Sequence, residues 1–390
     1  MMFNSTSGPV YLDYQATTPV DPRVFEIMRP YYKNHFGNPH SINHVYGWEA
    51  HDAVQMARGQ VADFIGADDD EIIFTSGATE SCNLAIRGVA KAIVRRRMSR
   101  NKFISVQTEH SAVFDTVLDL NLEGFESVIL PVGSDGLVDP ANIESVIDER
   151  TALVSVMAAN NEIGVIQPLD DISALCHAKG AIFHTDATQA AGRVDINVDA
   201  WGVDLLSLSA HKMYGPKGIG ALFVRRGVPI DPIQTGGGQE KALRSGTVPV
   251  GLSAGFGGAC QIASDEWAED TIRMTELTFR LTKGLQKEFP DLRLFGHSDL
   301  RVPGSLNIGI PGLSARQVIE MVSDRLAIST GSACLSDSTK PSRILLALGV
   351  GPEIAESGIR ISLGRFTTNE EIDVAIDVLT GVGARMNLVQ

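Results

Sequence analysis

Two polar side chains follow apolar runs of strand length, and their chemistry points to a bound cofactor. Lys212 comes just after the run from Val203 to Leu208, and Asp186 stands just past an earlier run at 181–184. A lysine amine can form a Schiff base with an aldehyde, and a carboxylate can pair with the pyridinium nitrogen of the same compound. The pair predicts pyridoxal 5'-phosphate as cofactor. A surface loop for the lysine and a helix cap for the aspartate are the alternatives.

Further polar residues follow other predicted strands, at what would be one edge of a parallel sheet. His110 follows one strand, and its imidazole could stack on an aromatic ring; a hydrogen-bonded structural histidine is the alternative. Asn160-Asn161-Glu162 follows another strand, where an amide could hold a phenolic oxygen or a carboxylate; an Asx turn is the alternative. Gln189 comes three residues after Asp186. Together these residues favour a ligand site at the sheet edge.

The turn Gly77-Ala78-Thr79 lies between a predicted strand and a predicted helix. Free backbone N–H groups at the start of a helix, together with a hydroxyl group, suit a phosphate. An ordinary strand-to-helix turn with Thr79 as the N-cap explains the same residues, because the turn has neither a Gly-x-Gly-x-x-Gly motif nor a nucleotide-type lysine loop. The turn supports a phosphate site through its combination with the other strand-end residues.

One of the four cysteines has surroundings unlike those of the others. Cys334 stands in a turn-rich stretch of small polar residues at 329–341, so an exposed loop is expected, from which its thiolate could reach a substrate. An incidental loop cysteine is the alternative. Cys82, Cys176 and Cys260 stand among Leu and Ala in helical patterns and are expected in the core. The chain has no C-x-x-C pair, which argues against a disulfide framework and a metal module, and a reduced compartment fits.

The elements that must position these residues alternate in type from about residue 45 to residue 225. Short apolar runs between helical segments are typical of an α/β fold with a mostly parallel central sheet. Strands are expected at 71–75, 103–106, 127–130, 152–157, 181–184, 203–208 and 220–224. A long helical pattern from about 253 to 289 precedes a smaller α+β unit, with strands at 305–309, 326–329 and 360–363 and helices near 314–324 and 369–384.

Length and charge restrict the class of protein. A chain of 390 residues exceeds one usual core, so we expect a large domain at 20–262 and a small domain made of 1–19 and 263–390. The net charge of −14 argues against direct binding of nucleic acid, and the basic run at 91–102 fits a helix end better than a docking site for an acidic partner or RNA. No apolar stretch suits a membrane span, and the N-terminus does not read as a signal peptide, so a soluble, cytoplasmic protein is expected.

The order of these motifs resembles the cysteine desulfurases of the NifS/IscS group. These are fold type I pyridoxal-phosphate enzymes of the class V aminotransferase superfamily. The resemblance covers almost the whole chain through the segments Tyr11–Pro19, Phe36–Pro39, Thr75–Ser81, Asn160–Gly164, Asp186–Gln189, Ser209–Lys212, Gly331–Cys334 and Arg360–Ser362. It implies an α/β fold type I architecture, a homodimer, L-cysteine as substrate and a sulfur-acceptor protein as partner.

The resemblance also implies a role for each matching position. Lys212, Cys334 and His110 would be catalytic: the lysine would hold the cofactor and move the substrate α-proton, the cysteine would take the sulfur as a persulfide and leave alanine, and the histidine would stack on the ring. Asp186 would pair with the ring nitrogen. The other cofactor contacts would come from Gln189 and Asn161 near the ring oxygen, from Gly77, Ala78, Thr79, Ser209 and His211 at the phosphate, and from Thr247 of the partner subunit. The substrate carboxylate would be held by Asn38, Asn161 and Arg360.

The sulfur acceptor stays open between an iron–sulfur scaffold, a sulfur carrier and tRNA thiolation. Housekeeping iron–sulfur members carry a longer C-terminal tail than a chain that stops at Gln390, and the stretch after Cys334 departs from their usual residues. Two other functions fit the same residues. One is a selenocysteine lyase or a C–S lyase that eliminates directly, in which Cys334 is dispensable; pyruvate instead of alanine as product would favour elimination. A catalytically idle sulfur carrier or scaffold partner that kept the fold would bind no pyridoxal phosphate.

Overall fold

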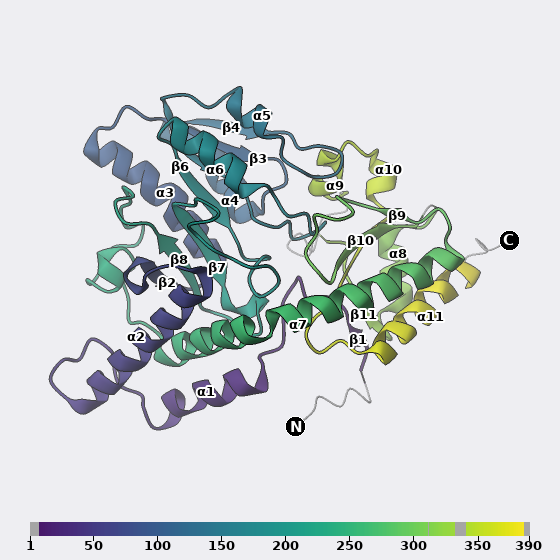
Figure 1. Ribbon diagram of the computed structural model, residues 1–390, viewed down its shortest axis with the longest axis horizontal. Coiled ribbons are helices and arrows are strands. Elements are labelled where there is room, and N and C mark those ends of the chain that lie inside the picture. The colour runs from purple at the N-terminus through teal and green to yellow at the C-terminus, as the bar shows by residue number, and fades with distance from the viewer. Residues whose placement is uncertain (1–7, 311, 332–340, 386–390) are drawn as a thin grey trace.

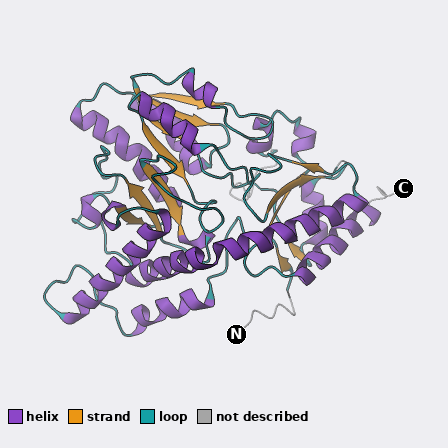
Figure 2. Ribbon diagram, in the orientation of Figure 1, coloured by secondary structure: helices purple, strands orange, loops and turns teal. Residues whose placement is uncertain are grey.

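A computed structural model describes residues 8–310, 312–331 and 341–385 of the chain. Its centre is a seven-stranded sheet (Figures 1 and 2). In spatial order the strands are β2 (Ile72–Thr75), β8 (Gly220–Val224), β7 (Leu205–Ser209), β6 (Ile182–Asp186), β5 (Thr151–Ser155), β3 (Lys102–Val106) and β4 (Glu126–Leu130). The predicted α/β fold with a mostly parallel sheet is confirmed.

Strand β8 is the exception, because it runs antiparallel to both of its neighbours. Only residues 210–219 connect β7 to β8, and a parallel crossover needs about a dozen residues or more. The chain therefore turns back beside β7. This short return carries Lys212.

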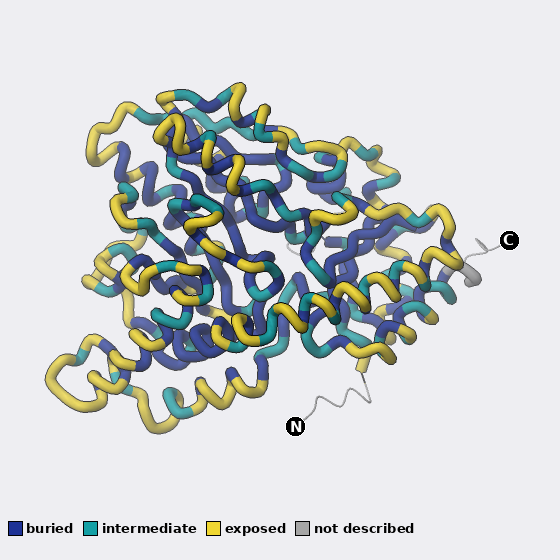
Figure 3. Tube along the Cα trace, in the orientation of Figure 1, coloured by how far each residue is buried: buried dark blue, intermediate teal, exposed yellow. Residues whose placement is uncertain are grey.

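Helices cover both faces of the central sheet, as Figure 1 shows. Helices α3 (Ala78–Arg96) and α4 (Ser111–Asp119) pack on one face of the strands, and α2 (Val45–Ile65) and α6 (Leu169–Ala178) pack on the opposite face. The central sheet and these helices form the first core of the molecule. Strands β2, β3, β5 and β7 are buried along their whole length, which is why they read as continuous apolar runs, whereas the edge strand β4 is only partly buried (Figure 3). Arg95 and Arg96 of the basic run lie in the last turn of α3, where cations suit the helix dipole, whereas Lys102 at the end of the run begins β3.

The long helix α7 (Val250–Glu288) joins this part of the molecule to a second core. It packs on α2 and α1 (Pro22–Lys33) near its start and on α11 (Asn369–Arg385) near its end. Gly257 permits a close approach to α2, since a Cβ at that position would lie 2.8 Å from the Cα of Ala57. Residues of α7 up to Ala263 belong to the core with α2, and those from Leu277 onward belong to the second core. The predicted domain boundary at 262 falls one residue before Ala263, the last of the first group, and it stays a prediction.

The second core lies under two small sheets. Strand β10 (Ser305–Gly309) pairs antiparallel with β12 (Gly358–Ser362) and β9 (Arg293–Leu294), and β1 (Val10–Tyr11) pairs parallel with β11 (Leu326–Ala327). The remaining helices are α5 (Pro140–Glu144), α8 (Ala315–Val322), α9 (Arg343–Ala347) and α10 (Pro352–Ala355). Among the described residues, no helix is long and apolar enough to cross a membrane.

Candidate active site

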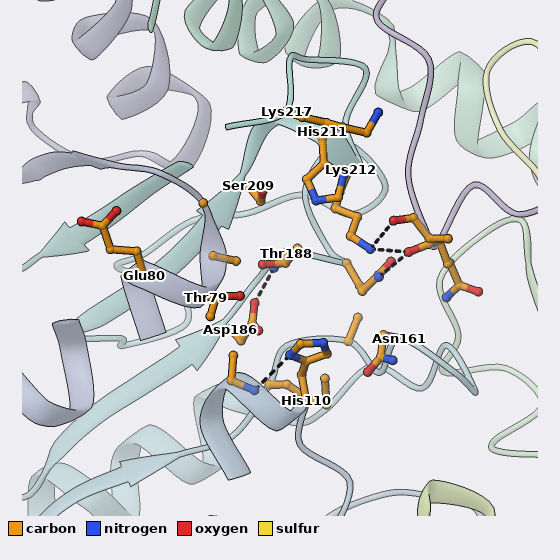
Figure 4. A pocket seen from close by; sticks show the side chains of 18 of the residues that line it. Thr79, Glu80, His110, Asn161, Asp186, Thr188, Ser209, His211, Lys212 and Lys217 are labelled. Carbon is orange, nitrogen blue, oxygen red and sulfur yellow. Dashed lines mark hydrogen bonds between the residues drawn. The ribbon is translucent and has the colours of Figure 1, made fainter. Parts of the chain in front are cut away.

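A cavity of about 580 Å³ lies where strands of the central sheet end, facing the segment that leaves β1. Figure 4 shows the side chains that line it. The cavity brings together eleven of the residues predicted from the sequence: Gly77, Ala78, Thr79, His110, Asn161, Asp186, Gln189, Ser209, His211, Lys212 and Arg360. They come from six separate stretches of the chain, so the fold, and not local sequence, places them side by side.

Lys212 lies at the end of the short helical turn Ala210–Lys212, directly after β7. Its Nζ donates hydrogen bonds to the backbone carbonyls of Gln15 (2.5 Å) and Ala16 (2.9 Å), as the dashed lines in Figure 4 mark. The side-chain amide of Gln189 donates to the same Gln15 carbonyl (3.0 Å). The amine is thus held in the cavity by the N-terminal segment, and the surface-loop alternative does not describe it.

Asp186 is the last residue of β6 and is 6% exposed. Its Oδ1 accepts a hydrogen bond from the backbone N–H of Thr188 (3.0 Å), so part of the carboxylate does serve the following turn. Its Oδ2 accepts from the thiol of Cys82 on α3 (3.7 Å). Both neighbours are neutral donors, so each carboxylate oxygen has a hydrogen-bond partner.

His110 has a structural role and also lines the cavity. Its Nδ1 accepts a hydrogen bond from Ala112 N (3.1 Å), which makes it the N-cap of α4.

Of the two adjacent asparagines, Asn160 has a structural role and Asn161 lines the cavity. Asn160 forms the Asx turn, since its Oδ1 accepts from the N–H groups of Glu162 (2.8 Å) and Ile163 (2.9 Å). The turn leaves Asn161 in the cavity, where its buried Oδ1 has no hydrogen-bond partner among the described residues.

The predicted phosphate turn opens α3. Gly77 is the N-cap with φ +150°, a conformation that L side chains rarely adopt, and it has no side chain that could cap the first N–H groups. The expected alternative of Thr79 as the N-cap is wrong, because Thr79 lies inside the first turn of the helix. The Glu80 carboxylate fixes the residue just before the turn, because it accepts hydrogen bonds from Ser76 N (2.7 Å) and from Arg244 Nε (2.8 Å). The helix therefore presents its first amides to the cavity.

His211 stands beside this turn as a neutral imidazole. Burial, followed by the charge of Lys212, lowers the pKa of His211 to about 4. Its Nδ1 is 3.0 Å from the Thr17 hydroxyl, and its backbone carbonyl accepts from the Thr18 hydroxyl (3.0 Å). Two residues of the N-terminal segment therefore fix the position of the ring and of the turn that carries the lysine.

Arg360 comes from β12 of the smaller sheet and reaches the cavity from the other side. The residue is 2% exposed, and its guanidinium contacts the Asp13 carboxylate (2.7 Å) and the Asn161 backbone carbonyl (2.9 Å). Its Nε is buried without a partner in the part of the chain that the structure describes. The arrangement can hold an anion at the end of the cavity away from Asp186.

Two predicted residues lie outside the cavity, and a third cannot be compared with it. Asn38 is exposed in the connection between α1 and α2, and its Oδ1 accepts from His40 N (3.0 Å). Thr247 is exposed on the loop before α7. Cys334 lies outside the described residues. The other three cysteines are buried, as the sequence predicted.

Sequence reasoning missed the contribution of the N-terminal segment. Asp13, Gln15, Ala16 and Thr17 contact Arg360, Lys212 and His211 through carbonyls, a carboxylate and a hydroxyl. The motif Tyr11–Pro19 was a visible signal, although backbone carbonyls leave no mark in a sequence. Among the residues that the structure describes, no three His, Cys, Asp or Glu side chains form a group that could hold a metal ion.

Residues 10–374 match the Aminotransferase class-V family. The chain is 48% identical over 373 residues to a probable mitochondrial cysteine desulfurase of Dictyostelium discoideum, an alignment that covers 95% of this chain and 82% of the relative. It is 47% identical over 378 residues to the cysteine desulfurase IscS of Rickettsia rickettsii (strain Iowa), which covers 96% of this chain and 91% of the relative. The chain belongs to the cysteine desulfurases of this family.

Solved cysteine desulfurase-like structures share the fold. A NifS-like protein superposes with a TM-score of 0.90 at 36% identity, covering 97% of this chain and all of the other (100%). A NifS-like protein from Rickettsia africae ESF-5 superposes with a TM-score of 0.85 at 32% identity, covering 96% and 99% of the two chains. The predicted fold type I class and the predicted family are therefore confirmed.

Cysteine desulfurases of this family depend on pyridoxal phosphate, and the cavity fits that cofactor. Its polar atoms have the required chemistry: an amine on Lys212, a carboxylate on Asp186, and uncapped N–H groups at the start of α3. Three buried atoms that line it have no partner among the described residues: Asn161 Oδ1, Thr188 Oγ1 and Arg360 Nε. Buried polar atoms of this kind are usually satisfied by a ligand or water. When bound, pyridoxal phosphate supplies an electron sink for carbanion chemistry.

Proposed function

We propose that the protein converts L-cysteine to L-alanine and keeps the sulfur as a persulfide on Cys334. The carbon–sulfur bond of the substrate breaks, the sulfur bonds to the Cys334 sulfur, and the substrate β-carbon gains a proton. The observation that carries the proposal is a single cavity that joins Lys212, Asp186 and Arg360 in a chain about half identical to cysteine desulfurases. Lys212 would hold the cofactor and move the α-proton, and Asp186 would pair with the ring nitrogen.

The ends of the cavity support an amino-acid substrate. Arg360 would bind the α-carboxylate, because a buried guanidinium recognises a carboxylate through charge-assisted hydrogen bonds. Asn161 would help through the N–H groups of its side-chain amide, with Gln189 near the ring oxygen. His110 would stack on the ring, and Gly77, Ala78, Thr79, Ser209 and His211 would hold the phosphate.

A homodimer is part of the proposal. A run of large apolar side chains along α1, α2 and their connection is at least 40% exposed in the single chain: Phe25, Ile27, Tyr32, Phe36, Ile42, Val45, Tyr46, Trp48 and Met56. Figure 3 shows this region as a largely exposed corner of the molecule. A patch of this size is typical of an association surface. The connection that holds Asn38 and the loop that holds Thr247 border one further cavity, lined by Pro39, His40, Gly238 and Val248. This proximity favours an interface to which both residues belong.

The product of labelled cysteine tests the activity. L-Cysteine carrying ¹³C at the β-carbon should yield labelled alanine, and mass spectrometry of the stopped reaction should find one extra sulfur on the peptide that contains Cys334. Labelled pyruvate would instead identify a lyase. Cys334→Ser should keep the bound cofactor and lose persulfide and sulfide, with Cys260→Ser as the matched control that keeps both. Normal sulfide output from Cys334→Ser would refute the mechanism.

The destination of the sulfur and the compartment belong to the same proposal. We place the enzyme in the cytoplasm, where it would pass the persulfide to an iron–sulfur scaffold protein or to a sulfur carrier. Transfer is measured by loading the enzyme with ³⁵S-cysteine, adding one purified acceptor, and counting the label on each protein. Label that stays on the enzyme with every acceptor of both classes would exclude these partners.

A further inference from the structure

Behind Asp186, four buried side chains form a polar band that the proposed reaction does not use. Ser155 on β5, His184 on β6 and Ser207 on β7 come from three neighbouring strands, and Cys82 faces them from α3. All four residues are 0% exposed. Polar groups are costly to bury in an apolar layer unless they form hydrogen bonds, so the alignment of these four side chains needs a physical explanation.

Hydrogen bonds connect three of the four side chains in a row, and the fourth, Cys82, stands between that row and Asp186. Ser155 Oγ lies 2.8 Å from His184 Nδ1, and His184 Nε2 lies 3.0 Å from Ser207 Oγ. The Ser207 hydroxyl faces the Cys82 sulfur, and the Cys82 thiol reaches Asp186 Oδ2 at 3.7 Å. The row therefore crosses three strands and returns to the end of the middle one.

The direction of each hydrogen bond follows from its last member. An ionised carboxylate only accepts, so the Cys82 thiol donates to Asp186. The Ser207 hydroxyl lowers the pKa of the Cys82 thiol, so we infer that its hydrogen points toward the Cys82 sulfur. Ser207 oxygen then takes its hydrogen bond from His184 Nε2–H. Burial lowers the pKa of His184 to about 4, so the ring is neutral and its Nδ1 accepts from the Ser155 hydroxyl.

We propose that Ser155, His184, Ser207 and Cys82 are positioning residues that point a head-to-tail row of neutral donors at Oδ2 of Asp186. The inference rests on the proposed pairing of Asp186 with the ring nitrogen. Donors in series strengthen one another, and they stabilise the carboxylate without a positive charge that would compete with the pyridinium. Thr188 N–H fixes the other oxygen, so both Asp186 oxygens are held.

One further titratable group faces this end of the cavity. Glu109 follows β3 and is fully buried, and its Oε1 accepts from Met157 N (2.6 Å). Burial, followed by the charge of Asp186, raises the pKa of Glu109 well above its usual value. This shift favours the protonated form of Glu109 beside Asp186.

The tautomer of His184 tests the direction of the row. The holoenzyme labelled with ¹⁵N-histidine is studied by NMR, and the His184 signals are assigned by their absence in His184→Gln. We expect a neutral ring with the proton on Nε2 from about pH 5 to pH 8. A proton on Nδ1, or a charged ring at pH 7, would overturn the proposal.

The thiol is tested by exchanging donors. Cys82→Ala should raise the dissociation constant of pyridoxal phosphate about fivefold to tenfold, because one hydrogen bond to a charged group is lost. Cys82→Ser, which keeps a donor, should recover most of that affinity, whereas Cys260→Ala, which empties a buried thiol elsewhere, should leave the constant unchanged. If the row only packs the core, Cys82→Ser and Cys82→Ala should raise the dissociation constant equally, and that result would contradict the proposal.

Asp186→Asn separates this inference from the proposed function. If Asp186→Asn weakens the cofactor while Cys82→Ala does not, the pairing with the ring nitrogen stands and the donor row fails. If Asp186→Asn leaves the absorption spectrum and the dissociation constant unchanged, the pairing itself is refuted, and the row loses its purpose with it.

Discussion

The two ends of the cavity are built differently. The end at Asp186 belongs to one core: its supports are strands of the central sheet and α3, they are buried, and they are neutral. The end at Arg360 joins segments of both cores, and its main contact is an ion pair between β12 and the N-terminal segment. We infer that substitutions at the first end act on the cofactor, while those at the second end act on the substrate.

Lys212 lies between the two ends and depends on both. It comes from the central sheet, while the carbonyls that hold it come from the segment that leaves the smaller sheet at β1. Loss of the amine should therefore affect both the cofactor and the substrate. We expect Lys212→Ala to lower alanine formation by at least about 10³-fold, as for other residues that act directly on the reacting atoms.

The control for that variant is Lys217→Ala, which removes an exposed lysine that lines the same cavity. Its rate, measured as labelled alanine, should stay within about threefold of the wild type, because a solvated charge contributes little. Equal losses of rate in the two lysine variants would show that the reaction needs positive charge near the cavity and does not need the amine of Lys212 in particular.

The substrate end is tested by Arg360→Lys. The lysine keeps the charge and loses the planar fork, so we expect KM for cysteine to rise about 100-fold. The dissociation constant of the cofactor should change less than threefold, since Arg360 lies opposite Asp186. Arg316→Lys on the exposed face of α8 is the control. A cofactor constant that moves as far as KM would abolish the proposed division of the cavity.

The cofactor end is tested by Gly77→Ala. The residue has φ +150°, where an L side chain is strained, although only Ser209 Oγ would lie within 4 Å of the new Cβ. Strain of this kind costs about 1–3 kcal/mol, so the cofactor constant should rise about tenfold while KM stays near its original value. Gly59→Ala in α2, where a Cβ meets open space, is the control. The cofactor constant is measured by fluorescence titration.

A further effect, on stability and not on binding or rate, is the pH dependence that His184 contributes. Its pKa is about 4 in the folded chain and 6.5 when unfolded, so the unfolded chain binds more protons between these values. The free energy of unfolding should therefore fall as the pH drops from 6.5 to 4, by up to about 3 kcal/mol. His184→Gln should remove this contribution in urea titrations at several pH values.

Two neighbours titrate in the same pH range, but both remain in the variant. His211 has the same sign as His184, and Glu109, whose pKa is raised, has the opposite sign above its usual value. The difference between the wild type and His184→Gln therefore isolates one residue. A difference that does not vary with pH would mean that His184 is not buried as a neutral ring.

The sequence predicted the parts of this molecule that apolar runs and side-chain chemistry define. Strands β2, β3, β5 and β7 are buried along their whole length, so each of these runs read as a strand, and β8 and β10 were predicted at their observed bounds. The antiparallel direction of β8 was not predicted, because it depends on the length of the connection at 210–219 and not on the apolar run itself. Asp186 and Lys212 were recognisable because polar residues at strand ends are unusual.

The contacts between distant segments could not be predicted. Asp13 reaches Arg360 over 347 positions, and the carbonyls that hold Lys212 carry no side-chain signal. Cys82 was correctly expected in the core, yet its partner Asp186 lies 104 positions away. His184 read as an ordinary strand residue, since one sequence does not reveal that serines from both neighbouring strands meet its ring.

The covalent site of the cofactor tests the central claim most directly. The purified holoenzyme is reduced with borohydride and digested, and the peptides are analysed by mass spectrometry. We predict one reduced pyridoxyl phosphate group per chain, on Lys212 and on no other lysine. An unmodified Lys212 in protein that carries the cofactor elsewhere would contradict the account.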